Sequence, residues 1–185
     1  MTKKGEVEKP ATPICLIYSA DQSQSNVTVP GECYEVLEGG NCKKVWITRR
    51  SVEHLKDNCL LRVWCGDMVF AMGDTKPTPY LFVVEFPVPE DFYTEFVAWY
   101  REEHVPMLLA NPDWQGTELY RANIQETPFS FTSVHHLSHP RALDSKERQA
   151  SRSTPWFFRL KVHSWFDQGF NRWLLKFISG EERGL

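Results

Sequence analysis

Several protein classes are excluded by what this chain lacks. Its 185 residues contain no apolar run of about 18 residues, so we expect no membrane-spanning helix. The net charge of −3 gives no excess of Lys and Arg, so we expect neither a nucleic acid nor a membrane as partner. A glycine-rich phosphate loop and a Gly-x-Ser-x-Gly turn are also missing, which argues against nucleotide cofactors and serine hydrolysis.

Paired metal-ligand motifs are absent as well. The chain has neither Cys-x-x-Cys nor His-Glu-x-x-His, and nothing selects an axial ligand for haem, so we expect no metal and no cofactor. The five cysteines are odd in number and all lie in the first 65 residues. Because residues 1–10 are rich in Lys and Glu and lack an apolar signal segment, we expect reduced, buried thiols in a cytoplasmic protein.

Aromatic residues are abundant. They make up 14% of the chain, with seven Trp and twelve Phe, and the hydrophobic content of 42% is enough for a core. Rings on this scale line a pocket or an interface as well as a core. The length suits one domain, or one domain with a substantial extension, and would be tight for two full domains.

Hydrophobic periodicity predicts an ordered second half after the turn residues that end near Pro79. The expected elements, in chain order, are strand 80–88, helix 91–105, strand 116–124, strand 129–137, helix 140–153, strand 157–166 and a helical tail over 170–178. This order is the ferredoxin-like split βαβ arrangement, an α+β fold with an antiparallel sheet and both helices on one face. The other sheet face requires a partner, and a second copy would close the two sheets into a barrel.

The first part of the chain supplies a candidate for that copy. Strands are predicted at 14–19, 44–47 and 60–70, with a short helix at 51–56. We therefore divide the chain into a disordered tail (1–12), an α+β segment that resembles a degenerate half-barrel (13–75) and a ferredoxin-like half-barrel with a C-terminal helical tail (76–185). The barrel closes either within the chain or by dimerisation, and the sequence leaves both open.

One octad, Trp99 to Pro106, concentrates chemistry at a helix end. Tyr100 and His104 are four residues apart and so share a helix face. Pro106 places the imidazole in the last regular turn or at a kink. A histidine there can serve as a general base, or it can be a half-exposed residue favoured by the helix dipole.

This octad also carries a family resemblance. Residues 96–106 (Phe-Val-Ala-Trp-Tyr-Arg-Glu-Glu-His-Val-Pro), followed by Glu-Leu-Tyr-Arg-Ala at 118–122, resemble the first helix and second strand of EthD-like dimeric α/β-barrel proteins. Residues 138–148, with Thr-Pro-Trp at 154–156, resemble that family's strand-to-helix segment and the entry to its last strand. The resemblance implies sheet-to-sheet pairing in a homodimer and a pocket between each sheet and its helices. Relatives include cofactor-independent cyclases, lyases, isomerases and monooxygenases acting on aromatic or polyketide-like molecules, and others without an assigned activity.

Candidate site residues follow from both lines of reasoning. His104 is the expected acid–base residue, helped by Tyr100 and by one of His135 and His136, which face opposite sides of a strand. The expected substrate-binding residues are Phe96, Trp99, Trp156, His163 and Trp165. The function expected is proton transfer (cyclisation, elimination or isomerisation) on an aromatic small molecule. The alternatives are a non-catalytic binder of hydrophobic ligands, an accessory protein, and a structural module whose rings fill the barrel.

Overall fold

The computed structural model describes residues 14–19, 31–39, 42–49, 61–123, 127–167 and 170–180. Its strands are β1 (Ile14–Ser19), β2 (Glu32–Glu38), β3 (Lys44–Thr48), β4 (Leu61–Gly73), β5 (Tyr80–Phe86), β6 (Trp114–Ala122), β7 (Phe131–Leu137) and β8 (Asn171–Ser179). Its helices are α1 (Tyr93–Trp99), α2 (Val105–Leu109), α3 (Lys146–Ser151), α4 (Pro155–Lys161) and α5 (Ser164–Asp167). Turns of 3₁₀ helix (Glu90–Phe92, Pro140–Asp144) and of π-helix (Tyr100–His104) complete the helical segments.

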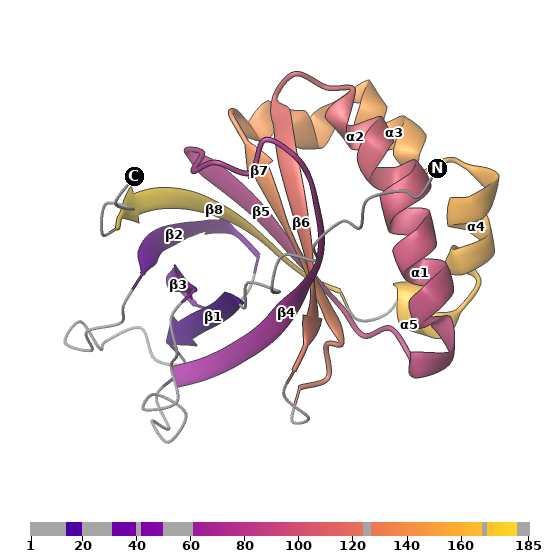
Figure 1. Ribbon diagram of the computed structural model, residues 1–185. Coiled ribbons are helices and arrows are strands. Elements are labelled where there is room, and N and C mark those ends of the chain that lie inside the picture. The colour runs from indigo at the N-terminus through magenta and orange to yellow at the C-terminus, as the bar shows by residue number, and fades with distance from the viewer. Residues whose placement is uncertain are drawn as a thin grey trace, which may run out of the picture.

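The strands form one closed antiparallel barrel in the order β1-β3-β2-β8-β5-β7-β6-β4. Strand β1 pairs with both β3 and β4, so the ring closes within a single chain. The helices of the described residues, α1 to α5, lie on one side, over β5, β6 and β7, whereas β1, β2 and β3 lie on the other (Figure 1). The predicted α+β fold is confirmed: it is the ferredoxin-like α/β barrel, with the first part of the chain in the place of a second copy. The homodimer itself stays a prediction.

Alternating side chains of β5 contribute to two separate hydrophobic cores. Leu81 and Val83 point into the barrel, and Phe82 and Val84 point toward the helices. This explains why residues 81–84 are apolar without a break: the strand is buried on both faces. The site described below lies in the outer core, between sheet and helices.

Two elements predicted near the C-terminal end are wrong, because the spacing of their apolar residues matches the other type of secondary structure. Residues 157–166, predicted as a strand, form α4 and α5: Thr154 caps the first helix by accepting from the Phe157 amide, and Pro155 occupies its first turn. Residues 170–178, predicted as a helical tail, form β8. That strand lies between β2 and β5, and its middle is buried at Trp173, Leu174 and Leu175. Because Trp173 and Leu174 are adjacent, they give the i, i+3, i+4, i+7 spacing of a helix together with Phe170 and Phe177.

The helical segment predicted over 91–105 is confirmed and continues beyond its expected end. Pro106 does not stop it, because a π-helical turn precedes the proline. The Val105 amide donates to the Tyr100 carbonyl, five residues back, which widens the helix just before the residue that lacks an N–H. Such wide turns cluster at functional sites, and this one contains Tyr100 and His104.

The expectation of reduced thiols is wrong for one pair: Cys15 and Cys65 form a disulfide, while Cys33 and Cys42 are free. The two bonded residues face each other directly in the β1–β4 register, with their Cα atoms 4.2 Å apart. Pairing of strands 50 residues apart created this contact, and spacing in the sequence does not reveal it.

Two further predicted strands are confirmed, and two predicted segments lie outside the residues that the structure describes. Strands 44–47 and 60–70 correspond to β3 and β4, whereas β2 was not predicted. The tail 1–12 and the helix 51–56 lie outside the described residues. No helix in the described ranges is long and apolar enough to span a bilayer.

A buried acid inside the barrel gives the fold a pH dependence. Glu85 has no exposed surface; Asn171 donates to its Oε2 over 3.1 Å, and its Oε1 has no partner in the described part of the chain. Burial, opposed by the Asn171 hydrogen bond, raises the pKa of Glu85 to about 7. The carboxyl is therefore neutral in the folded protein at pH values where an unfolded chain has lost this proton.

Replacing Glu85 with glutamine should stabilise the protein at pH 8 and leave it nearly unchanged at pH 5. Because the folded pKa is raised, the unfolded chain binds fewer protons between pH 4.5 and 7, and stability is lost as the pH rises through this window. The loss should reach about 3 kcal/mol, and the glutamine variant should lack it. Urea unfolding of both proteins at pH 5 and pH 8 measures the difference. An equal pH dependence in the two proteins would contradict the assignment.

Candidate functional site

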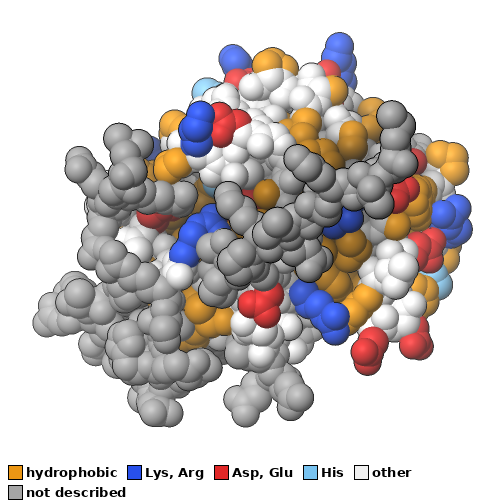
Figure 2. Space-filling model, viewed as in Figure 1, with side chains coloured by type: hydrophobic (Ala, Val, Ile, Leu, Met, Phe, Trp, Pro, Cys, Tyr) orange, Lys and Arg blue, Asp and Glu red, His pale blue; other side chains and the backbone are white. Residues whose placement is uncertain are grey.

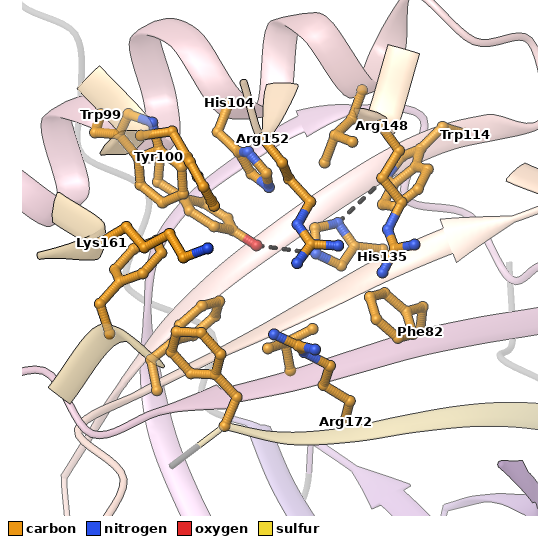
Figure 3. Close-up of a pocket in the computed structure, with 16 residues that line it drawn as sticks. Phe82, Trp99, Tyr100, His104, Trp114, His135, Arg148, Arg152, Lys161 and Arg172 are labelled. Atoms are coloured by element: carbon orange, nitrogen blue, oxygen red, sulfur yellow. Dashed lines mark hydrogen bonds between the residues drawn. The ribbon is translucent and has the colours of Figure 1, made fainter. Parts of the chain in front are cut away.

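A pocket opens between the sheet and the helix layer. It measures about 630 Å³ with its open mouth included. Figure 3 shows side chains that converge on it from the sheet and from the helices. The lining residues are Phe82, Val84, Phe86, Trp99, Tyr100, His104, Leu108, Trp114, His135, Arg148, Arg152, Phe157, Lys161, Phe166, Phe170 and Arg172.

His104 reaches this pocket from the π-helical turn. Its ring packs against those of Trp99 and Tyr100, with centroids 4.6 and 5.0 Å away. Nδ1 faces the Ser151 carbonyl oxygen at 3.4 Å, so the Nδ1–H tautomer donates to it and Nε2 is left as the acceptor. Burial, with a further contribution from the charges of Arg152 and Arg148, lowers the pKa of His104 to about 3. The imidazole is therefore neutral at pH 7.

His135 forms the centre of a second polar group on the pocket wall. Trp114 Nε1–H donates to its Nδ1 over 3.2 Å, which places the ring proton on Nε2. Nε2–H donates to the Tyr100 hydroxyl over 2.9 Å, and that hydroxyl donates to Ser133 Oγ over 2.9 Å. Both nitrogens are thus occupied, so His135 orients Tyr100 and is not an open base.

Burial also keeps this group uncharged. It lowers the pKa of His135 well below its usual value, an effect that His104, His136 and Arg148 reinforce. It raises the pKa of Tyr100, which its bond to Ser133 opposes only in part. At pH 7 the Tyr100 hydroxyl is protonated and His135 is a neutral imidazole.

Every charged residue of the lining is basic. Arg148 and Arg152 come from α3 and its C-terminal cap, Lys161 from α4 and Arg172 from β8. Arg148 lies over the Phe82 ring at 5.6 Å and donates to the Leu143 carbonyl. Burial, together with the charges of Arg152 and Arg172, lowers the pKa of Arg148. The pocket thus combines aromatic walls, neutral imidazoles and a positive mouth.

The structure brings together some of the predicted site residues and separates others. Those that line the pocket are Trp99, Tyr100, His104 and His135. Those that do not are Phe96, His136, Trp156, His163 and Trp165. Phe96 is fully buried behind Tyr100, and His163 stacks on Trp165 beside Phe92, outside the pocket.

His136 lies on the opposite face of β7, inside the barrel, as the period of a strand requires. Its Nε2 is 3.3 Å from Glu118 Oε2. Glu118 also accepts from Arg49 over 2.8 Å, and Arg49 donates to the Tyr120 hydroxyl over 2.7 Å. This group ties β3 to β6 across the barrel and does not reach the pocket.

Sequence reasoning missed the basic residues of the pocket. The spacing of Arg148 and Arg152, four apart in a predicted helix, was the available signal, since it places both on one helix face. Lys161 and Arg172 gave no comparable signal, because each lies in an element whose type was predicted wrongly. No group of three or more His, Cys, Asp or Glu in the described ranges is placed to hold a metal ion.

Comparison with known proteins places the fold. No family model matches the chain, and no curated protein matches it. An anthrone oxidase-like protein superposes with a TM-score of 0.61 at 10% identity, covering 93% of each chain. A ferredoxin fold protein related to antibiotic biosynthesis monooxygenases, from Listeria monocytogenes, gives 0.55 at 12% identity, covering 91% of this chain and 96% of that one.

A third solved structure, a mutant chlorite dismutase from Candidatus Nitrospira defluvii in complex with cyanide, gives a TM-score of 0.59 at 10% identity, covering 91% of this chain and 92% of that one. These neighbours include monooxygenase-like and anthrone oxidase-like proteins. The EthD-like assignment stays a prediction. At these identities the likeness establishes the fold alone: this chain is a ferredoxin-fold α/β barrel.

Proposed function

We propose that the protein is a cofactor-independent enzyme that transfers a proton from an aromatic or polyketide-like small molecule bound in this pocket. The observation that carries the proposal is His104, a neutral imidazole whose Nε2 is left free in an aromatic pocket with a positive mouth. A phenol, an enol or a carbon acid next to a ring carbonyl is the matching substrate class. The names of the anthrone oxidase-like and monooxygenase-related neighbours agree with such substrates.

In the proposed step an O–H or C–H bond of the substrate breaks and its proton moves to Nε2 of His104. The electron pair stays on the substrate and delocalises onto an oxygen as a phenolate or enolate. The positive charges of Arg148 and Arg152 stabilise that anion beside the buried His104 ring, and the anion in turn stabilises the imidazolium. The anion then cyclises, eliminates, isomerises or reacts with dioxygen as a second substrate.

The Ser151 carbonyl and the Tyr100–His135 pair give this step its geometry. The carbonyl fixes the His104 tautomer, so that the accepting nitrogen is the one left free for the ligand. Tyr100 and His135 provide a neutral polar wall between Phe82 and the helix. The aromatic side chains supply the stacking surface.

Anthrone, a tricyclic carbon acid, should exchange its methylene hydrogens for deuterium in the presence of the protein under argon. Exchange followed by NMR reports proton transfer alone, and admission of air then tests oxygenation separately. Quenching of tryptophan fluorescence, to which Trp99 in the pocket wall contributes, measures binding. We expect exchange well above that of imidazole buffer of equal concentration. Saturable quenching without exchange would instead identify a non-catalytic binder of hydrophobic ligands.

A further inference from the structure

The charges of the pocket differ from those on the face of the molecule drawn in Figure 2. In Figure 2 acidic and basic side chains are interspersed with hydrophobic ones on the face shown. In the pocket, Arg148, Arg152, Lys161 and Arg172 face one space, and no Asp or Glu of the described residues lines it. Figure 3 shows Arg152 and Arg172 reaching into the same opening from opposite sides.

Three other arginines of the described chain have carboxylate partners, whereas Arg101 and Arg121 lie over aromatic rings. Arg49 pairs with Glu118, Arg141 with Asp113 and Arg159 with Glu95. Among the described residues, no salt bridge includes Arg148, Arg152 or Lys161. Asp144 is close enough for its charge to act on Arg148, but it does not line the pocket, so no carboxylate among the described lining residues balances these cations.

Like charges held together beside an aromatic surface favour binding of an anion. Arg148 is half-buried, lies over Phe82 and is close enough to Arg152 and Arg172 for their charges to act on it. A single negative charge formed during proton transfer would leave most of this positive charge uncompensated. The geometry thus favours a ligand that brings a negative charge of its own.

We propose that the substrate is an aromatic acid, with a carboxylate bound by Arg148 and Arg152 and with its acidic O–H or C–H directed at His104. The planar guanidinium groups match a planar carboxylate through paired N–H bonds. The rings of Phe82 and Phe170 lie beneath Arg148 and Arg172, so a fused aromatic ring can stack where its acid group meets the cations. The placement of the ligand's acidic O–H or C–H next to His104 rests on the proposed function. The binding of its carboxylate by Arg148 and Arg152 does not rest on it.

The test compares acids with amides of the same shape. The probes are one-, two- and three-ring hydroxyaryl carboxylates, such as a hydroxynaphthoate, each paired with its carboxamide, and binding is measured by calorimetry at 20 and 300 mM salt. The acids should bind at least about 10-fold more tightly than their amides at low salt, and the preference should shrink at high salt. The variant Arg152→Gln should reduce acid affinity about 10-fold and leave amide affinity unchanged.

Lys146→Gln is the matched control, because it removes one positive charge from the same helix at a side chain that is 91% exposed and does not line the pocket. It should change acid affinity less than twofold. Equal effects of the two variants, or no acid in the series binding more tightly than its amide, would overturn the proposal. If the acids bind more tightly than the amides but show no deuterium exchange, the proposed function is wrong and the carboxylate site stands. If exchange occurs but acids and amides bind with equal affinity, the carboxylate site is wrong and the proposed function stands.

Discussion

Replacing His104 with alanine is expected to slow proton transfer about 10²- to 10⁴-fold while ligand affinity changes only a few-fold. General bases contribute on this scale, and the aromatic and cationic contacts that bind the ligand stay in place. The measurement is the rate of deuterium exchange or product formation at saturating ligand, with affinity from fluorescence quenching. Imidazole added to the solution should restore part of the lost rate, because the deleted ring leaves a space of its own size.

A matched control is His163→Ala, which removes a half-buried imidazole stacked on Phe92 and Trp165 outside the pocket. It should keep the full rate. The pH profile provides a second check: because burial and the nearby arginines lower the pKa of His104 to about 3, kcat/KM should not decline between pH 8 and pH 5 through protonation of this base. An unchanged rate in His104→Ala would show that another group accepts the proton.

Replacing Glu118 with glutamine is expected to destabilise the protein by about 2 to 3 kcal/mol. Its carboxylate is only 4% exposed and accepts from Arg49, and removal of its charge leaves a partly buried guanidinium, 28% exposed, without its counter-charge. The pKa of Glu118 is lowered by the His136 hydrogen bond and by Arg49, in spite of an opposing burial effect that is the largest single contribution. The carboxylate is thus charged in the folded state. Urea unfolding at pH 7 measures the loss.

The comparison variant is Arg141→Gln, which breaks a pair of the same kind at the surface, where Arg141 is 71% exposed. Its cost should stay below about 1 kcal/mol. The double variant Arg49→Gln with Glu118→Gln should lose less than the sum of the two single variants, because it leaves no charge unpaired. Equal losses in Glu118→Gln and Arg141→Gln would show that the tie across the barrel adds no stability beyond that of a surface pair.

The fold was predictable where local pattern and packing agree. Strands β5, β6 and β7 and helix α1 were found because their apolar periods match the surfaces that they bury. The apolar pattern predicted a helix in place of β8, because this strand lies in the middle of a sheet that is covered on both faces. It predicted a strand in place of α4, because alternate apolar residues belong there to a short capped helix. Barrel closure and the Cys15–Cys65 bond depend on pairing between distant segments, which no local period records.

The candidate site was predictable in its aromatic and imidazole part alone. His104 and Tyr100 follow from helical spacing, and the prediction that His135 and His136 face opposite sides is confirmed by their separate surroundings. Either His135 or His136 could lie on the sheet face that the helices cover, beside His104. The sequence does not decide between them, because the helix-covered face is set only when the barrel assembles. The cationic mouth was missed because two of its four residues lie in elements predicted as the wrong type.

Closure of the barrel inside one chain has a consequence for how this protein can change over time. In a barrel made from two identical subunits, every substitution occurs twice, so a residue that improves a binding surface must also be tolerated at its symmetry mate. Here the strands opposite the helices have their own sequence. They can acquire a disulfide between β1 and β4 without altering the pocket-bearing half, whereas the arginine that crosses the barrel requires its partner Glu118 on β6. Substitutions in the two halves are thus free of symmetry and are coupled only where side chains meet.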